Sequence, residues 1–249
     1  MKLIISPGFR NLKSWLNDIS RLFDSQDGVI VHQGRNTIKN FTLDGIPVTI
    51  KRFKRVNLAQ QIAYTFFRKT KAERAFRYAS IFRQRGISTP QEIAYAEIKR
   101  HGLFTTGYFI SATCPYPPAF PALVDNPGYD RQLATDLARH IAEMHRKGIV
   151  HGDLNLGNFL YHKNNSGHYD FTVIDINRSK FYNSPPPQKI CAKNLRTLTH
   201  RRDLFRFMVE EYAKAMGWET NTMLEAATKE LEKLESRYRR KQQIKKLIR

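Results

Sequence analysis

An ordered set of polar residues in the second half of the chain constrains the fold more than any other feature. Residues 151–158 read HGDLNLGN, and Asp175 follows at the end of the apolar run FTVID, seventeen positions after Asn158. In this order Asp153 can accept a proton from a hydroxyl nucleophile, while Asn158 and Asp175 can face one metal ion. Each part alone is common. The ordered set predicts the catalytic loop and the metal-binding strand of a phosphotransferase.

The pattern of apolar residues predicts a β-rich first half. Short β-prone stretches alternate with turns, and one amphipathic helix spans residues 71–84 before Gly86. Asp44 and Gly45 form a hairpin turn between two of the predicted strands. These strands cover residues 29–31, 37–43, 47–53, 92–99 and 108–113. Five prolines in residues 114–128 disfavour regular structure there. The sequence therefore predicts an N-terminal lobe (1–113), a linker (114–128) and a C-terminal lobe (129–249).

The C-terminal lobe is predicted to be mainly helical. One apolar face runs from Leu133 to Met144, and a second helix covers residues 203–216. Between them, strands at 159–162 and 169–174 are predicted to form a hairpin, with Asn158 at its entrance and Asp175 at its exit. A last helix is predicted to start with a capping box at residues 222–225 and to run into a basic tail.

The charge of the chain predicts a polyanionic partner. The sequence has 42 Lys and Arg against 22 Asp and Glu, a formal net charge of +20. Basic residues concentrate in residues 68–85 and in the tail, residues 237–249. Solvated helix faces that only aid solubility are the alternative interpretation. The functional interpretation is attachment to an anionic surface.

The number of cysteines and the length of the apolar runs indicate in which cellular compartment the protein is expected. Cys114 and Cys191 are too few for a disulfide framework, which favours a reducing compartment. No secretory signal and no apolar run of about 20 residues is visible in the sequence, so a soluble or peripheral protein is expected.

Over nearly its whole length the chain resembles the protein kinase-like superfamily. Besides the HGDLNLGN loop and Asp175, the run VTIK at residues 48–51 is similar to the strand that carries the nucleotide-binding lysine. The resemblance implies a bilobal α+β fold, with an antiparallel-sheet N-lobe carrying one helix and a mainly helical C-lobe. It also implies that Lys51 holds the phosphates of ATP and that Glu73 is its ion-pair partner, with Glu92 and Glu97 as other acidic candidates.

The same resemblance implies a role for each remaining site residue. Asp153 would orient or deprotonate the acceptor hydroxyl, Asn158 and Asp175 would hold Mg²⁺, and His151 would brace the loop. The further nucleotide contacts fall on Gly34, Arg35 and Asn36 in the loop over the phosphates, and on Thr113 and Cys114 beside the adenine.

Three shorter motifs resemble those of the bacterial lipopolysaccharide core kinases, the Kdo and heptose kinases. They are GISTP at residues 86–90, IDINR at 174–178 and RDL at 202–204. The resemblance implies a sugar hydroxyl of the inner core as acceptor. It also implies a cytoplasmic enzyme, peripheral on the inner face of the cytoplasmic membrane, with an anionic glycolipid as substrate.

Departures from protein kinases narrow the prediction. The nucleotide loop has one glycine in place of three, DIN at residues 175–177 replaces DFG, and no APE run follows. Constitutive activity is therefore expected. Asn155 stands where protein-directed kinases carry Lys, which favours acceptors other than protein side chains.

Three alternatives stay open at this point. A kinase for a small sugar or an aminoglycoside would use the same loop. A ribosome-associated or RNA-associated member would use the basic clusters, although the sequence lacks interleaved aromatic and basic residues for stacking bases. A pseudokinase scaffold would keep the fold without the chemistry.

Overall fold

The structure, a computed structural model, describes residues 1–247. The chain divides into two compact units, Met1–Pro115 and Tyr116–Arg249. The division falls at the start of the segment that we predicted as a linker. Most of that segment belongs to the second unit, where it contains the short helix η3 (Pro121–Asp125) and where the Tyr161 amide donates to the Pro117 carbonyl at 3.0 Å.

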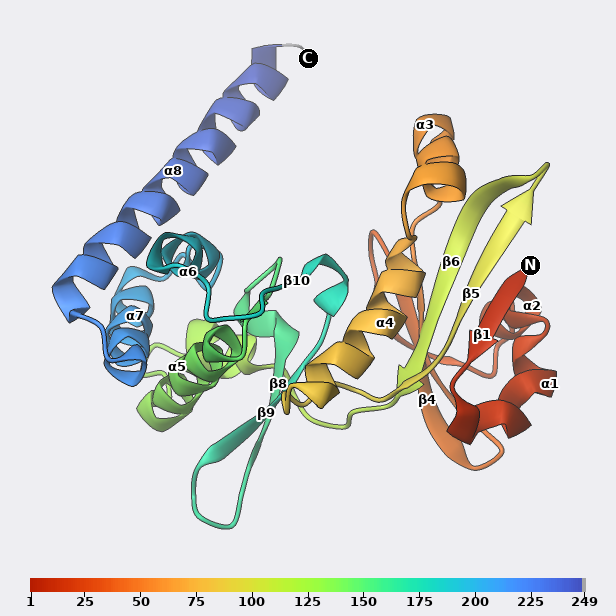
Figure 1. Cartoon of the computed structure of the whole chain (residues 1–249), viewed down its shortest axis with the longest axis horizontal. Helices are drawn as coiled ribbons and strands as arrows, with labels where there is room; N and C mark the ends of the chain where they lie inside the picture. The colour runs from red at the N-terminus through yellow and green to blue at the C-terminus, as the bar shows by residue number, and fades with distance from the viewer. Residues whose placement is uncertain (248–249) are drawn as a thin grey trace. The chain divides into compact units, whose positions relative to one another are not determined.

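An antiparallel sheet of six strands organises the first unit, in the spatial order β1-β5-β6-β4-β3-β2 (Figure 1). The turn at Asp44 and Gly45 has positive φ angles of 49° and 76°, as expected for the predicted tight hairpin. The strands are β1 (Lys2–Ile5), β2 (Val29–Gln33), β3 (Thr37–Leu43), β4 (Ile46–Arg52), β5 (Glu92–Arg100) and β6 (Leu103–Ala112). β6 begins five residues before the predicted strand, and β1 was not predicted.

One face of this sheet is covered by N-terminal helices that the sequence analysis missed. They are η1 (Pro7–Leu12), α1 (Lys13–Leu16) and α2 (Ile19–Asp24). Leu16, Ile19 and Phe23 are fully buried there, in one core with Val48 and Ile50 of β4. The first unit therefore has more helices than the single one that was predicted.

The other face carries α4 (Lys71–Gln84), whose bounds match the predicted helix. The Thr70 hydroxyl accepts from the Glu73 amide at 3.1 Å and caps the N-terminus, and Gly86 lies just beyond the C-terminus with a φ of 66°. Ala72 packs with Phe53 and Tyr95 of the sheet. Between β4 and α4 the chain forms two short helical segments that were not predicted, α3 (Leu58–Ile62) and η2 (Ala63–Phe67).

Helices dominate the second unit, as predicted. The helices are α5 (Arg131–Arg146), α6 (Gln188–Leu195), α7 (Arg202–Met216) and α8 (Thr220–Leu247), with η4 (Leu156–Asn158) and η5 (Ile176–Arg178) as single turns. Two small antiparallel pairs complete it, β7 (Ile149–Val150) with β10 (Lys180–Phe181), and β8 (Phe159–Lys163) with β9 (Tyr169–Val173). α6 was not predicted.

The predicted start of the last helix was wrong by two residues. α8 begins at Thr220, because the Glu219 carboxylate accepts from the amides of Asn221 and Thr222 and so caps the helix earlier than the capping box would. The last two residues of the predicted basic tail lie outside the described residues. Across residues 1–247, no helix has the length and apolar content required to cross a bilayer.

Candidate active site

The predicted catalytic loop connects β7 to β8 in the second unit and passes very close to another backbone segment. A side chain at Gly152 would place its Cβ 2.3 Å from the Arg178 carbonyl oxygen and 2.5 Å from the Arg178 Cβ. Only glycine fits this contact without a shift of one segment. The close approach brings the loop against η5, which follows the metal-binding strand in the sequence.

His151 is fully buried and ties the loop to that strand. Its Nδ1 accepts from the Asp153 amide at 3.2 Å, and its Nε2 donates to the Ile174 carbonyl at 3.0 Å. Burial lowers the pKa of His151 below its ordinary value, which agrees with a neutral ring that donates from one nitrogen and accepts at the other. The side chain therefore packs and hydrogen-bonds, as the sequence analysis predicted.

A buried polar network behind the loop was not predicted from the sequence. Asn194 on α6 donates from Nδ2 to the His151 carbonyl at 2.5 Å, and its Oδ1 lies 3.0 Å from Nε2 of His145. Nδ1 of His145 in turn lies 2.7 Å from the Tyr212 hydroxyl on α7. Burial lowers the pKa of His145 to about 4, so the ring is neutral and links a donor to an acceptor. Three helices thus hold the loop backbone.

Asp153 is half-buried, and its neighbours orient it. Asn155 donates from Nδ2 to Asp153 Oδ1 at 3.2 Å, and the Arg178 guanidinium lies 3.4 Å from Oδ2. Asn158 donates from Nδ2 to the Asp153 carbonyl at 2.8 Å. Since this bond uses the amide nitrogen of Asn158, its side-chain oxygen is the end that can face a cation. Arg178 was not among the predicted site residues, although it belongs to the IDINR motif.

The β8–β9 hairpin brings Asn158 and Asp175 to the same end, as predicted. The pair continues beyond the strands, because the Ile174 amide donates to the Asn158 carbonyl at 2.9 Å. Asp175 follows in the left-handed region, with φ 54° and ψ 38°, which is unusual for a residue other than glycine and is often found at functional sites. Asn177 donates to Asp175 Oδ1 at 2.5 Å.

This pair of oxygen-bearing side chains fits a magnesium ion. Mg²⁺ prefers oxygen ligands, and in phosphotransferases it takes one or two protein side chains, substrate phosphates and water. In the part of the chain that the structure describes, no group of three His, Cys, Asp or Glu side chains forms a metal cluster on its own. An amide oxygen from Asn158 and a carboxylate from Asp175 are the donor set expected when phosphates supply the remaining ligands.

The predicted nucleotide residues lie in the first unit. Lys51 stands on β4 between Ile50 and Arg52, and its Nζ lies 5.4 Å from the centre of the Phe53 ring, on the face that carries α4. Glu73 is buried in the first turn of α4. Its carboxylate accepts from Arg77 Nε at 2.8 Å and lies 3.9 Å from Lys2 Nζ.

The other acidic candidates have partners of their own. The Glu92 carboxylate lies 2.6 Å from Arg83. The Glu97 carboxylate accepts from the Thr70 hydroxyl at 2.6 Å and lies 3.7 Å from Lys2 Nζ. Glu73 also has basic partners, Arg77 and Lys2, so its pairing with Lys51 stays a prediction from the resemblance.

The loop between β2 and β3 contains the predicted phosphate contacts. The Gly34 amide donates to the Asn36 carbonyl at 3.1 Å, and Asn36 Oδ1 accepts from the Lys54 amide at 3.1 Å. Asn36 thus braces this turn against the end of β4, while the Arg35 side chain is exposed. Thr113 packs its hydroxyl 3.1 Å from that of Thr49, and Cys114 is half-buried after β6.

Comparison with known proteins first defines the class. A solved structure of "WaaP in complex with acyl carrier protein" aligns with a TM-score of 0.61 at 16% identity, over 96% of this chain and 99% of that one. The fold is therefore protein kinase-like, and the predicted α+β fold class is confirmed.

The family follows from the sequence. The model of the lipopolysaccharide kinase (Kdo/WaaP) family matches residues 50–219, and the chain belongs to that family, as predicted. Two curated relatives are 3-deoxy-D-manno-octulosonic acid kinases. The one from Vibrio cholerae serotype O1 is 25% identical over 145 residues, and the one from Vibrio vulnificus is 27% identical over 132 residues. These matches cover 55% and 51% of this chain, and 61% and 56% of the relatives.

Proposed function

We propose that this protein is an ATP-dependent kinase that phosphorylates a sugar hydroxyl, Kdo or heptose, of the lipopolysaccharide inner core. The observation that carries the proposal is the geometry of the loop and hairpin in the second unit. There one carboxylate, Asp153, stands beside an oxygen pair, Asn158 and Asp175, on a shared backbone framework. The family supports the glycolipid substrate, and the two curated relatives favour Kdo.

In the proposed reaction Asp153 is the base. Its carboxylate accepts the proton of the sugar hydroxyl while the hydroxyl oxygen bonds to the γ-phosphorus of ATP, and the bond from that phosphorus to the leaving oxygen of ADP breaks. Asn155 and Arg178 orient the two carboxylate oxygens before the sugar binds. Asn158 and Asp175 hold Mg²⁺, which neutralises phosphate charge when bound.

The nucleotide-binding roles belong to the first unit in this proposal. Lys51 binds the phosphates of ATP and Glu73 limits the orientations that its side chain can take. Gly34, Arg35 and Asn36 cover the phosphates, with Asn36 shaping the turn through its bond to the Lys54 amide. The backbone near Thr113 and Cys114 contacts the adenine.

The charge supports a location at the inner face of the cytoplasmic membrane. The basic helix α8 and the basic residues of α4 would be attracted to anionic lipid, with roughly 1 kcal/mol for each Lys or Arg near the surface. A membrane-bound glycolipid would then be presented to a peripheral enzyme.

The test is transfer of labelled phosphate from magnesium-ATP to Kdo-lipid A and to heptose-containing core. Asp153→Asn keeps the size of the side chain but removes the base. Asp170→Asn, on the exposed part of β9, is the matched control. We expect label on one glycolipid with the wild type and the control, and a loss of about 10²-fold or more with Asp153→Asn.

Other outcomes point elsewhere. Wild-type protein that binds magnesium-ATP but labels no acceptor would indicate a pseudokinase. Label on an aminoglycoside or a free sugar in preference to both glycolipids would reject the glycolipid substrate. RNA binding that survives moderate salt would revive the ribosome-associated alternative.

A further inference from the structure

An unusual apolar surface lies on the helical segment between β4 and α4. Four large apolar side chains of α3 and η2 are directed to solvent: Leu58, Ile62, Phe66 and Phe67. Phe66 is 68% exposed and Phe67 is 80% exposed, and their rings lie 6.3 Å apart. Soluble proteins seldom expose neighbouring aromatic rings to this extent unless the surface binds something. We call these four residues the apolar ridge.

The four exposed side chains are not needed to pack the segment against the sheet, because other side chains of the same segment make those contacts. The Tyr64 ring lies 5.6 Å from the Phe104 ring, and the Thr65 hydroxyl accepts from the Phe104 amide at 2.9 Å. The Arg68 amide donates to the Ala63 carbonyl five residues earlier, so the last turn is a π-helix. This wide turn leaves both phenylalanines outside.

The charges around the ridge are all of one sign. No acidic residue occurs between Asp44 and Glu73, whereas seven Lys and Arg do. Glu73 is itself buried and bonded to Arg77. The basic residues that directly flank the ridge are Lys54, Arg55, Arg68 and Lys69, and all four are exposed.

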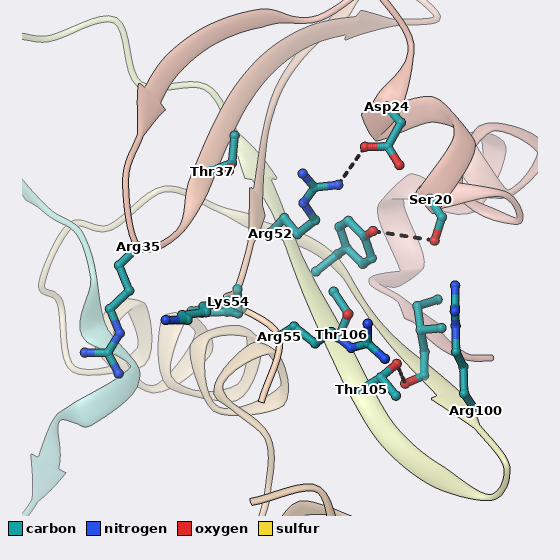
Figure 2. A pocket seen from close by; sticks show the side chains of 13 residues that line it. Ser20, Asp24, Arg35, Thr37, Arg52, Lys54, Arg55, Arg100, Thr105 and Thr106 are labelled. Atoms are coloured by element: carbon teal, nitrogen blue, oxygen red, sulfur yellow. Dashed lines mark hydrogen bonds and ion pairs between the residues drawn. The ribbon is translucent and has the colours of Figure 1, made fainter. Parts of the chain in front are cut away.

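A basic cavity lies at the same end of the sheet. It has a volume of about 420 Å³ and is lined by five cationic side chains: Arg35, Arg52, Lys54, Arg55 and Arg100 (Figure 2). Figure 2 shows Arg52 turned toward Asp24, with which it pairs at 2.6 Å. Among the described residues, none of the other four cations forms an ion pair. Thr37 and Thr106 also line the cavity.

Most of this cavity lies on the opposite face of the sheet from Lys51, and Arg35 is the lining residue that it shares with the proposed phosphate loop. Side chains alternate across a strand, so Arg52 and Lys51 face opposite sides of the sheet. Arg52 lies on the side of α2, where its guanidinium carbon is 4.5 Å from the centre of the Phe23 ring. Lys51 lies on the side of α4. Lys54 and Arg55 connect the cavity to the ridge, because they line the cavity and lie four and three residues before Leu58, the first residue of α3.

We propose that the apolar ridge and the basic cavity together form a docking surface for an anionic phospholipid bilayer. The ridge inserts its aromatic and aliphatic side chains into the interface between headgroups and acyl chains, and the cavity receives a lipid phosphate. Exposed Phe and Leu beside Lys and Arg are the combination that binds such an interface. An acidic protein would match the basic charge alone, whereas a bilayer interface matches both the charge and the four exposed apolar side chains.

The role of the docking surface, which is to bring the enzyme to a membrane-bound sugar, rests on the proposed function. Its test measures lipid binding without turnover, so the docking surface and the kinase activity can fail independently.

The experiment is flotation of the full-length protein with vesicles. One set is phosphatidylcholine alone, and two others also contain phosphatidylglycerol, a phosphate diester, or phosphatidic acid, a phosphate monoester. The ridge variant is Phe66→Ser/Phe67→Ser and the cavity variant is Arg55→Gln/Arg100→Gln. Val29→Ser, an exposed apolar position on the edge strand β2, and Arg139→Gln, an exposed arginine on α5, are the controls. Thermal melting verifies that each variant folds.

We expect the ridge variant to reduce partitioning into both anionic vesicles about tenfold or more, and to remove the part of binding that resists salt. The cavity variant should reduce partitioning into anionic vesicles, most with phosphatidic acid, and both controls should bind as the wild type does.

Two results would overturn the proposal. A ridge variant that floats with vesicles as well as the wild type would show that the basic helices alone reach the lipid. Inorganic phosphate that binds with a dependence on Arg55 and Arg100, while vesicle binding ignores both residues, would assign the cavity to a soluble anion.

Discussion

Replacing Asn194 with alanine would test whether the buried network holds the loop from behind. The change removes the donor to the His151 carbonyl and the acceptor for His145 Nε2. Each buried group left without a partner costs about 1–3 kcal/mol. We therefore expect the free energy of unfolding of the second unit to fall by about 2–6 kcal/mol.

The two tryptophans allow this unit to be followed by itself. Trp15 lies in the first unit, whereas Trp218 lies in the second, with its ring 6.0 Å from that of Tyr212. In a Trp15→Phe background, urea unfolding followed by fluorescence reports on Trp218. This matters because a two-unit chain need not unfold in one step.

Lys193→Ala, an exposed neighbour on the same helix, is the control and should change stability by less than about 0.5 kcal/mol. Tyr212→Phe removes only the hydroxyl 2.7 Å from His145, so it should cost about 1–3 kcal/mol. If Asn194→Ala lowers stability no more than Lys193→Ala does, water replaces both hydrogen bonds and our account of the network is wrong.

Two further predictions concern protonation and packing in the second unit. Burial lowers the pKa of His140 and of His145 to about 4, from an ordinary value of 6.5. The unfolded chain therefore binds more protons between these values, so stability should be greatest above pH 6.5 and should fall as the pH drops toward 4. His140→Phe should make this fall shallower, because phenylalanine binds no proton. Its ring can keep the packing of His140 against Phe171, whose ring lies 5.3 Å away. Urea midpoints from pH 4 to 8 would measure the slope, and an unchanged slope would contradict the prediction. Gly152→Ala forces a Cβ against the Arg178 carbonyl and should cost about 1–3 kcal/mol, together with phosphotransfer. An alanine variant with wild-type melting and activity would show that the two segments separate easily.

Local signals explain why parts of the fold were predictable. The bounds of α4 were correct because Thr70 caps its start and Gly86 supplies a left-handed residue beyond its end. The prediction of the β8–β9 hairpin was correct because a polar turn separates two β-prone runs. The register of the hairpin by itself places Asn158 and Asp175 at the same end.

Other parts carry weaker or purely tertiary signals. Leu12, Leu16, Ile19 and Phe23 recur at helical spacing, but the helix breaks at Asp18, which caps α2 through the Arg21 amide. The resulting pieces are too short for a clear periodic pattern. Asn194 could not be assigned to the site, because its contact with the His151 carbonyl spans 43 positions and depends on how α6 packs.

The main chain of Ile174 has a consequence for how this site can vary. Its amide donates to the carbonyl of Asn158, and its carbonyl accepts from His151, so the backbone of this single residue fastens both ends of the HGDLNLGN loop. Hydrogen bonds to backbone atoms therefore fix the spacing between the proposed base, Asp153, and the proposed metal ligands, Asn158 and Asp175. The side chain at position 174 can therefore vary among all residues that have an amide hydrogen. Proline has none, so it would remove the bond to the Asn158 carbonyl and release the strand that leads to Asp175 from the loop that carries the base.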